Sequence, residues 1–199
     1  MSWKSTIAVR MNVGPTIMLG SGAWFDFCAP ADSDFTIEDI AHGLANICRY
    51  SGQCSSFYSV AEHSVLVSEV AAGFEFEGLL HDAAEAFIGD ITRPLKQILP
   101  EYKRIERDVE TAIFERFGIS SMPAPEVKSA DLRVLAAEQQ QIMPKGTDWW
   151  VQSEKLIPAP VVVRHLPPDE AKQEFLARYE ALRPANLLTK ASRAVHGVL

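Results

Sequence analysis

The chain has 199 residues, of which 47% are hydrophobic and 23% are charged, which favours one globular domain and excludes a disordered or fibrous protein. Acidic residues outnumber basic ones by 26 to 19, giving a net charge of −7. Because phosphate backbones are bound by basic surfaces, this balance argues against duplex nucleic acid as a partner. The net charge does not exclude small anionic substrates, since binding them needs only a few local cations.

Hydropathy and cysteine content indicate the compartment. No apolar run reaches the ~18 residues that would span a bilayer. The first residues, Met1-Ser2-Trp3-Lys4, lack the basic-then-apolar order of a secretory signal. The three cysteines are an odd number in a chain long enough to bury a core without disulfides. We therefore expect a cytoplasmic protein that does not bind membranes.

The first 35 residues predict a hairpin and a loop that pack on the core. Thr6 to Val13 alternates apolar and polar residues, and Thr16 to Leu19 follows a Gly14-Pro15 turn. These two runs predict a short β-hairpin. The aromatic stretch from Trp24 to Asp34 is interpreted as a loop.

From Thr36 onward the apolar residues recur with a helical period. Thr36 predicts a helix N-cap, Ser59 to Glu62 is a capping-box pattern, and Gly118 is typical of a helix end. The pattern predicts about six helices, over 36–47, 59–73, 75–87, 100–117, 125–143 and 167–182. Between them we expect a helical turn at 94–99, a loop at 144–160 and a strand at 161–163. The fold class is mainly α, with a helical domain over 36–183 and a tail over 184–199.

The segment from His81 to Glu85 carries the most chemistry. His81, Asp82 and Glu85 share about a quarter of a helix circumference, on a helix otherwise built for burial. A buried acid beside a buried histidine is costly unless it is paired, protonated or bound to a metal. A divalent metal would remove that cost, because imidazole and carboxylate both suit such an ion. The alternative is a core histidine satisfied by its carboxylate partner.

Two further residues strengthen the metal interpretation. His63 lies within the preceding predicted helix, and adjacent antiparallel helices can bring it opposite His81. Asp131 is another acid within an apolar helix. Alone, His63 could be a hydrogen-bonded helix residue, and Asp131 could pair with Arg133 or Lys128 at the surface.

The order His, His-Asp, Asp resembles the HD-domain superfamily of metal-dependent phosphohydrolases, and within it the small branch of 5′-deoxynucleotidases and phage-type deoxynucleotide phosphohydrolases. The resemblance spans about residues 39 to 143 and rests on several blocks in order. They are Asp39-Ile40-Ala41-His42 with Asn46 and Arg49-Tyr50-Ser51-Gly52, Phe57-Tyr58-Ser59-Val60-Ala61-Glu62-His63-Ser64, Leu80-His81-Asp82-Ala83-Ala84-Glu85, Gly89-Asp90-Ile91-Thr92-Arg93-Pro94-Leu95-Lys96 and Lys128-Ser129-Ala130-Asp131.

The resemblance implies a metal centre. The ligands would be His63, His81, Asp82 and Asp131, holding one divalent ion per chain. The donor set suits Co, Mn, Zn, Fe or Ni, and Mg also stays open. The ion would polarise the phosphate and lower the pKa of a bound water.

The resemblance also implies roles for residues near the metal. Glu85 is the candidate for handling the proton of the attacking water, with orientation of a ligand histidine as the alternative. Asp90 would hold a sugar hydroxyl or a catalytic water, unless it is an ordinary turn residue. Arg49 and Lys96 match the family's phosphate contacts, and Tyr50 would stack on a base or sugar. As alternatives, Arg49 and Lys96 would be solvated surface charges.

The resulting hypothesis is an enzyme that hydrolyses nucleotides, with a preference for deoxynucleotides implied by the resemblance. It would be either a 5′-monophosphatase or a triphosphohydrolase of deoxynucleoside triphosphates. Two alternatives are a catalytically idle HD-fold protein that binds nucleotides, and a hydrolase of another phosphoester such as a signalling nucleotide. Relatives of this kind often dimerise, so we also expect a homodimer.

Overall fold

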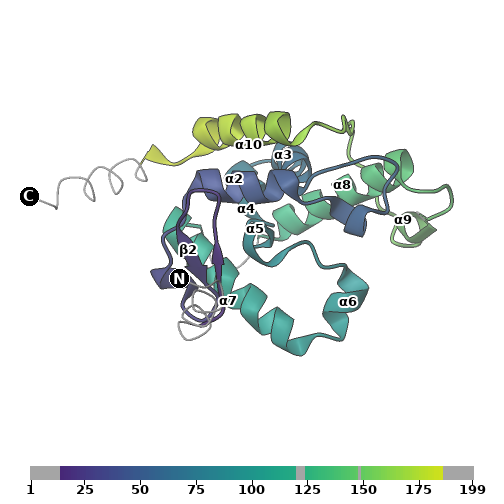
Figure 1. Ribbon diagram of the computed structural model, residues 1–199. Coiled ribbons are helices and arrows are strands. Elements are labelled where there is room, and N and C mark those ends of the chain that lie inside the picture. The colour runs from purple at the N-terminus through teal and green to yellow at the C-terminus, as the bar shows by residue number, and fades with distance from the viewer. Residues whose placement is uncertain (1–13, 120–123, 148, 186–199) are drawn as a thin grey trace, which may run out of the picture.

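A computed structural model describes residues 14–119, 124–147 and 149–185 (Figure 1). The described residues are mainly helical and carry a short antiparallel β-hairpin near the N-terminus, which confirms the predicted fold class. The run from Thr6 to Val13 and the tail beyond Ala185 lie outside the described residues. No described helix combines the length and the apolar character that crossing a membrane requires.

The hairpin pairs β1 (Thr16–Met18) with β2 (Trp24–Asp26), and Ile17 lies opposite Phe25. The interpretation of the whole stretch from Trp24 to Asp34 as a loop is therefore wrong at its start. Phe25 is fully buried, and its ring stacks on Phe87 with the centroids 4.1 Å apart. The aromatic residues thus attach the hairpin to the helical core.

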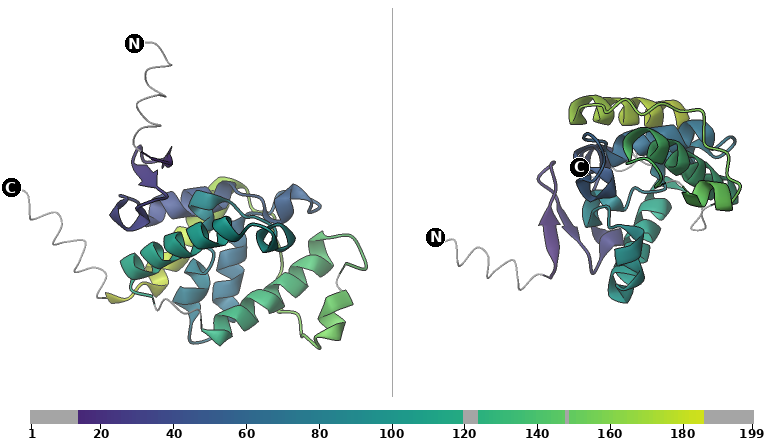
Figure 2. Two further views of the ribbon diagram at one scale, coloured as in Figure 1. Left: turned by 90° about the horizontal axis from the view of Figure 1, so that it is seen from below. Right: turned by 90° about the vertical axis from the view of Figure 1, so that its right-hand side faces the viewer.

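The helices follow one another through most of the remaining chain (Figure 1). They are η1 (Pro30–Asp32), α2 (Ile37–Asn46), η2 (Arg49–Gly52), α3 (Val60–Val70), α4 (Glu75–Leu80), α5 (Glu85–Ile88), α6 (Arg93–Gln97), α7 (Pro100–Phe117), α8 (Pro125–Ile142), α9 (Trp149–Ser153) and α10 (Pro168–Leu182). Helix α3 packs against α2, α4, α8 and α10. Figure 2 shows the same packing from two further directions.

Helix α3 is buried all round. Every residue from Val60 to Ser68 is buried. Val60 and Val65 belong to the core cluster shared with α2 and α4, whereas Leu66 and Val67 belong to a second cluster shared with α8. A helix without a polar face must lie inside the molecule. Any polar side chain in the middle of α3 is therefore removed from solvent.

Local capping signals are confirmed in part. Thr36 and Asp39 form a reciprocal capping box at the start of α2, and Gly118 ends α7 in the left-handed conformation with φ 68°. At the start of α3 the Ser59 hydroxyl accepts from the amide of Glu62. The expected return bond from the Glu62 carboxylate is replaced by a tertiary contact.

That tertiary contact explains the departure from the capping box. The Glu62 carboxylate accepts hydrogen bonds from the amides of Arg164 (2.6 Å) and Leu166 (2.9 Å). Two backbone donors on a distant segment satisfy this buried acid better than one local amide. The segment before α10 is thereby tied to α3, and Val161–Val163 runs beside α8 without forming the predicted strand.

Two other expectations need correction. The helix predicted over 75–87 is interrupted between α4 and α5, where Glu85 and Ala86 donate their amides to carbonyls only three residues back. Such bonds tighten the helix into a 3₁₀-like turn. The predicted loop over 144–160 contains the short helix α9.

Candidate metal centre

The four predicted ligands lie together at the centre of the helical domain. His63 comes from α3, His81 and Asp82 from the tight turn between α4 and α5, and Asp131 from α8. The His63 Nε2 atom lies 3.5 Å from Asp82 Oδ2 and 3.3 Å from Asp131 Oδ1. The His81 Nε2 atom lies 3.1 Å from Asp82 Oδ2 and 4.0 Å from Asp131 Oδ1. Two imidazoles and two carboxylates therefore face one another.

Both histidine rings are fixed by their Nδ1 atoms. Nδ1 of His81 lies 2.8 Å from the carbonyl oxygen of Gly78, and Nδ1 of His63 lies 2.5 Å from Oε1 of Glu138. A carbonyl and a carboxylate can only accept, so each Nδ1 carries the proton. In a neutral ring the Nε2 atom is then left with its lone pair. This arrangement is the one in which metal-binding histidines are usually held.

The site fits a divalent metal ion. Ligand atoms of His63, His81 and Asp131 all lie within 4.8 Å of one another. The Nε2 atoms of both histidines are buried, and neither has a hydrogen-bond partner among the described residues. A buried polar atom without a partner is costly, and coordination of an ion removes the cost. His63, His81 and Asp131 could thus hold a metal ion, with Asp82 beside them.

The charge at the site also favours a cation. Burial lowers the pKa of His81, but the neighbouring Asp82 carboxylate outweighs burial and raises the pKa to about 9. Burial would raise the pKa of Asp82, yet His81, His63 and Arg49 hold it well below its usual range. The negative charge between the rings therefore attracts a positive species, whether a proton or a metal ion.

Close packing of α4 on α3 brings the two histidines together. A Cβ atom at Gly78 would lie 3.0 Å from Ala71 Cβ and 3.2 Å from Ser68 Cα. Both distances are shorter than ordinary van der Waals contact, so a larger residue would push the two helices apart and glycine favours their close approach. The ring centroids of His63 and His81 are consequently 5.2 Å apart.

A buried acid that the sequence analysis missed lies behind His63. Glu138 has no solvent exposure, and its carboxylate accepts from His63 Nδ1, from the hydroxyls of Tyr50 and Tyr58, each at 2.7 Å, and from Arg49 Nη2 at 3.4 Å. Burial would raise the pKa of Glu138, but Arg49 and His63 hold it far below its usual range. Its spacing from Asp131, two turns along one helix face, was the available signal.

The predicted substrate residues Arg49 and Tyr50 lie at this end of the site. The guanidinium of Arg49 is buried between Glu138 and Asp82, with Nη1 3.6 Å from Asp82 Oδ2. Its Nε atom is buried and has no hydrogen-bond partner among the described residues. The backbone of Tyr50 adopts the left-handed conformation, with φ 56°, which costs on the order of 1 kcal/mol or more. Its hydroxyl bond to Glu138 stabilises that turn.

Glu85 and Lys96 form the opposite side of the site. Lys96 Nζ donates to Glu85 Oε1 at 3.3 Å and to Glu106 Oε1 at 2.5 Å. Glu85 is buried, and its Oε2 atom has no hydrogen-bond partner within the described part of the chain. Burial, together with Asp82 and Asp90, raises the pKa of Glu85 well above its ordinary value. Glu106 is a second residue that the sequence analysis did not single out.

Asp90 and Glu110 complete the acidic surroundings. Burial raises the pKa of Asp90, while Arg49 counteracts that effect and Asp82 adds to it. Burial, followed by Glu106 and Asp82, raises the pKa of Glu110 to about 7. The charges of Arg49 and Asp82 therefore act on the Asp90 carboxyl.

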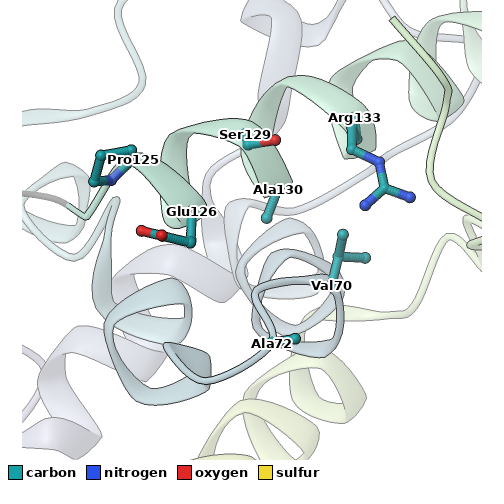
Figure 3. A pocket seen from close by; sticks show the side chains of 7 residues that line it. All are labelled: Val70, Ala72, Pro125, Glu126, Ser129, Ala130 and Arg133. Atoms are coloured by element: carbon teal, nitrogen blue, oxygen red, sulfur yellow. The ribbon is translucent and has the colours of Figure 1, made fainter.

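Other polar features lie away from the candidate metal centre. His42 is exposed and packs beside Gly20. A pocket of about 380 Å³ lies along another face of α8 (Figure 3), and its α8 residues are roughly 100° to 160° around the helix from Asp131. Its residues are Val70, Ala72, Pro125, Glu126, Ser129, Ala130 and Arg133. This pocket is therefore separate from the site.

Comparison with known proteins finds two bacterial relatives. The chain is 41% identical over 165 residues to the uncharacterized protein YfdR of Escherichia coli, covering 81% of this chain and 92% of YfdR. It is 35% identical over 184 residues to the uncharacterized protein RCAP_rcc00048 of Rhodobacter capsulatus, with the same two coverages. No protein-family model matches the sequence.

Proposed function

The chain belongs to the family of YfdR and RCAP_rcc00048, and we propose that it is a phosphohydrolase of nucleotides, most of all deoxynucleotides, that depends on one divalent metal ion. The relatives' names state no activity, so the proposal rests on the site. The observation that carries it is the convergence of two buried Nε2 atoms without hydrogen-bond partners and two carboxylates, with both Nδ1 atoms already committed. The order of these four residues in the sequence resembles the HD-domain phosphohydrolases.

Four residues would bind the ion. His63 and His81 would supply their Nε2 atoms, and Asp82 and Asp131 one carboxylate oxygen each. Such an ion polarises a phosphoryl oxygen and makes hydroxide available near neutral pH. The ligand types are compatible with Co, Mn, Zn, Fe, Ni or Mg, and they do not select among them.

Glu85 is suited to accept the proton of the attacking water. Its Oε1 atom is engaged by Lys96, whereas its buried Oε2 atom is left without a hydrogen-bond partner. Burial, with Asp82 and Asp90, raises the pKa of this carboxyl, which makes it a stronger proton acceptor than an ordinary glutamate. Asp90 would assist by holding a second water or a sugar hydroxyl.

Arg49 and Lys96 would stabilise the phosphate. Arg49 Nε is a buried donor without a hydrogen-bond partner in the described chain, and an oxyanion at the metal would satisfy it. Lys96 uses two of its three N–H groups on Glu85 and Glu106, which leaves the third for a phosphoryl oxygen. Both cations are already paired with carboxylates, so they would neutralise charge without making the site basic overall.

An apolar pocket near Lys96 supports a nucleobase as part of the substrate. Its volume is about 440 Å³, within the range of small-molecule sites, and Phe27, Phe87 and Tyr102 contribute aromatic walls. The Tyr102 ring centroid lies 5.8 Å from Lys96 Nζ, and the Tyr102 hydroxyl donates to the carbonyl of Gly89. Through Tyr102 the pocket thus lies next to Lys96, one of the two residues assigned to the phosphate. Tyr50, bound to Glu138 on the opposite side of the site, does not line this pocket and would stack on a sugar or base there.

The experiment is a hydrolysis panel. Protein stripped of metal and reloaded with Co, Mn, Zn or Mg is given deoxynucleoside and ribonucleoside mono-, di- and triphosphates. Ion chromatography then separates phosphate from tripolyphosphate. We expect turnover with at least one metal, and the released anion distinguishes a monophosphatase from a triphosphohydrolase. No turnover with any metal, despite one bound ion per chain, would overturn the proposal in favour of another phosphoester or a binding role.

A further inference from the structure

We infer that Glu138 is the positioning residue of this site: its buried carboxylate holds the metal ligand His63 and the cation Arg49 in one arrangement, so that metal affinity and phosphate affinity depend on the same side chain. The inference about Arg49 rests on the proposed function, whereas the inference about His63 requires only the metal site. No step of the proposed hydrolysis uses Glu138 directly.

The first support is the number of donors that meet at Glu138. Oε1 accepts from His63 Nδ1 and from the Tyr58 hydroxyl, and Oε2 accepts from the Tyr50 hydroxyl and from Arg49 Nη2. An ionised carboxylate has about four lone-pair positions. All four are used, by donors from η2, from α3 and from the segment between them. Glu138 therefore joins parts of the chain that carry different functions.

The second support is the chemistry of the contacts. An ionised carboxylate only accepts, so it fixes the proton of His63 on Nδ1 and turns Nε2 towards Asp82 and Asp131. A glutamine amide has the same shape, but its NH₂ group would face two of the four donors. The environment consequently selects a carboxylate over its neutral isostere.

The third support is the position of Glu138 on α8. Asp131 and Glu138 are seven residues apart and lie on one face of the helix. Asp131 faces the Nε2 side of the His63 ring, and Glu138 holds its Nδ1 side. One helix thus contacts both nitrogens of the same imidazole, which leaves the ring little freedom to rotate.

The test compares Glu138→Gln with Glu138→Asp by calorimetric titration of metal-free protein with Mn²⁺. We expect Glu138→Gln to weaken Mn²⁺ binding by about 10- to 100-fold, as is typical when the partner of a ligating histidine is lost. Glu138→Asp keeps the charge and should lie between the wild type and Glu138→Gln. A residue that only fills space would give the reverse order, because Asp is smaller and Gln is isosteric; that order would overturn the inference.

Glu62→Gln is the matched control. Glu62 is also a buried carboxylate and is next to His63 in the sequence, but it binds the amides of Arg164 and Leu166 and not the ring. We expect Glu62→Gln to lower stability while leaving Mn²⁺ affinity within about twofold of wild type. Equal losses of Mn²⁺ affinity in Glu62→Gln and Glu138→Gln would show a general loss of packing and overturn the inference.

Two further readouts separate the inference from the proposed function. In the Zn²⁺-loaded protein, the ¹H–¹⁵N signal of His63 Nδ1–H should lie far downfield and move upfield in Glu138→Gln; an unchanged signal would contradict the His63 contact. At saturating Mn²⁺, Glu138→Gln should bind inorganic phosphate about tenfold more weakly, because Arg49 loses its partner. Unchanged phosphate affinity would overturn the part concerning Arg49. Neither readout requires turnover, so both hold their meaning if no nucleotide is hydrolysed.

Discussion

The two sides of the candidate metal centre are built differently. His63, Asp131 and Glu138 come from the long helices α3 and α8, and the two of them nearest the core, His63 and Glu138, have no solvent exposure. Glu85 and Lys96 come from the short segments α5 and α6, and Lys96 is partly exposed. In Figure 1, α6 lies beside the start of α7 and away from α3 and α8.

This difference indicates a division of labour. On the side of α3 and α8, one hydrogen-bonded network fixes the donors, so their geometry is tied to the stability of the core. On the side of α5 and α6, Lys96 donates hydrogen bonds to two carboxylates. It can exchange one of these bonds for a bond to an entering anion. We therefore expect changes on the first side to alter metal binding, and changes on the second side to alter turnover with the metal retained.

The largest effect is expected from Asp82→Ala. Removing this carboxylate takes away the acidic group that lies 3.5 Å from His63 Nε2 and 3.1 Å from His81 Nε2. Metal affinity should fall by about 100-fold or more, and hydrolysis should fall to background. Metal content after dialysis, measured by mass spectrometry, checks this expectation. Wild-type metal content in this variant would remove Asp82 from the ligand set.

Glu85→Ala should give the next largest effect, of a different kind. Loss of a general base lowers kcat by about 10²- to 10⁴-fold. Because Glu85 contacts Lys96 and not the ligand nitrogens, metal content should equal that of the wild type. Steady-state kinetics on metal-loaded protein provides the measurement. Near-wild-type kcat would show that another group handles the proton.

Arg49→Ala should affect both substrate binding and stability. The substitution removes a candidate phosphate donor, so KM should rise by about tenfold. It also leaves Glu138 as a buried carboxylate without its cation, which costs about 3 kcal/mol of stability. Urea unfolding and kinetics on the same preparation test the two effects. Unchanged KM together with lowered stability would make Arg49 a purely structural residue.

The smallest effect concerns Glu110 and pH. Its pKa is raised to about 7 in the folded protein, above the 4.5 of an ordinary glutamate. A carboxyl with a raised pKa stabilises the fold fully below pH 4.5, and this contribution is lost as the pH rises through about 7. Glu110→Gln should thus become more stable relative to the wild type between pH 5 and about 8, measured by urea unfolding of metal-free protein.

The same substitution at exposed Glu115 serves as the control for that pH series. Glu115 lies on the same helix but on its solvent face. A difference between wild type and Glu110→Gln that stays constant with pH would contradict the assigned shift.

Local signals in the sequence predicted much of the fold. Thr36 and Gly118 act through neighbours within one turn, so the start of α2 and the end of α7 could be read directly. The strand at Trp24–Asp26 could not be predicted from local signals, because its position depends on the stacking of Phe25 on Phe87, which belongs to a distant helix. The turn that separates α4 from α5 was also missed, since its sequence keeps a helical period.

The candidate site shows the same limit. His63, His81, Asp82 and Asp131 were recognised by their order along the chain, and the structure brings them together. Glu138 was missed because its partners, from Arg49 to His63, lie 75 to 89 residues away in the sequence. An acid in the middle of a helix is usually solvated, and only tertiary packing shows that this one is buried.

We expect one divalent ion to bind between the two histidines and the two aspartates. A crystal structure of the Mn²⁺-loaded protein, with anomalous data collected to locate the ion, tests it most directly. We predict a single anomalous peak in contact with Nε2 of His63, Nε2 of His81 and the carboxylates of Asp82 and Asp131. A peak elsewhere, or none here at saturating Mn²⁺, would contradict the claim.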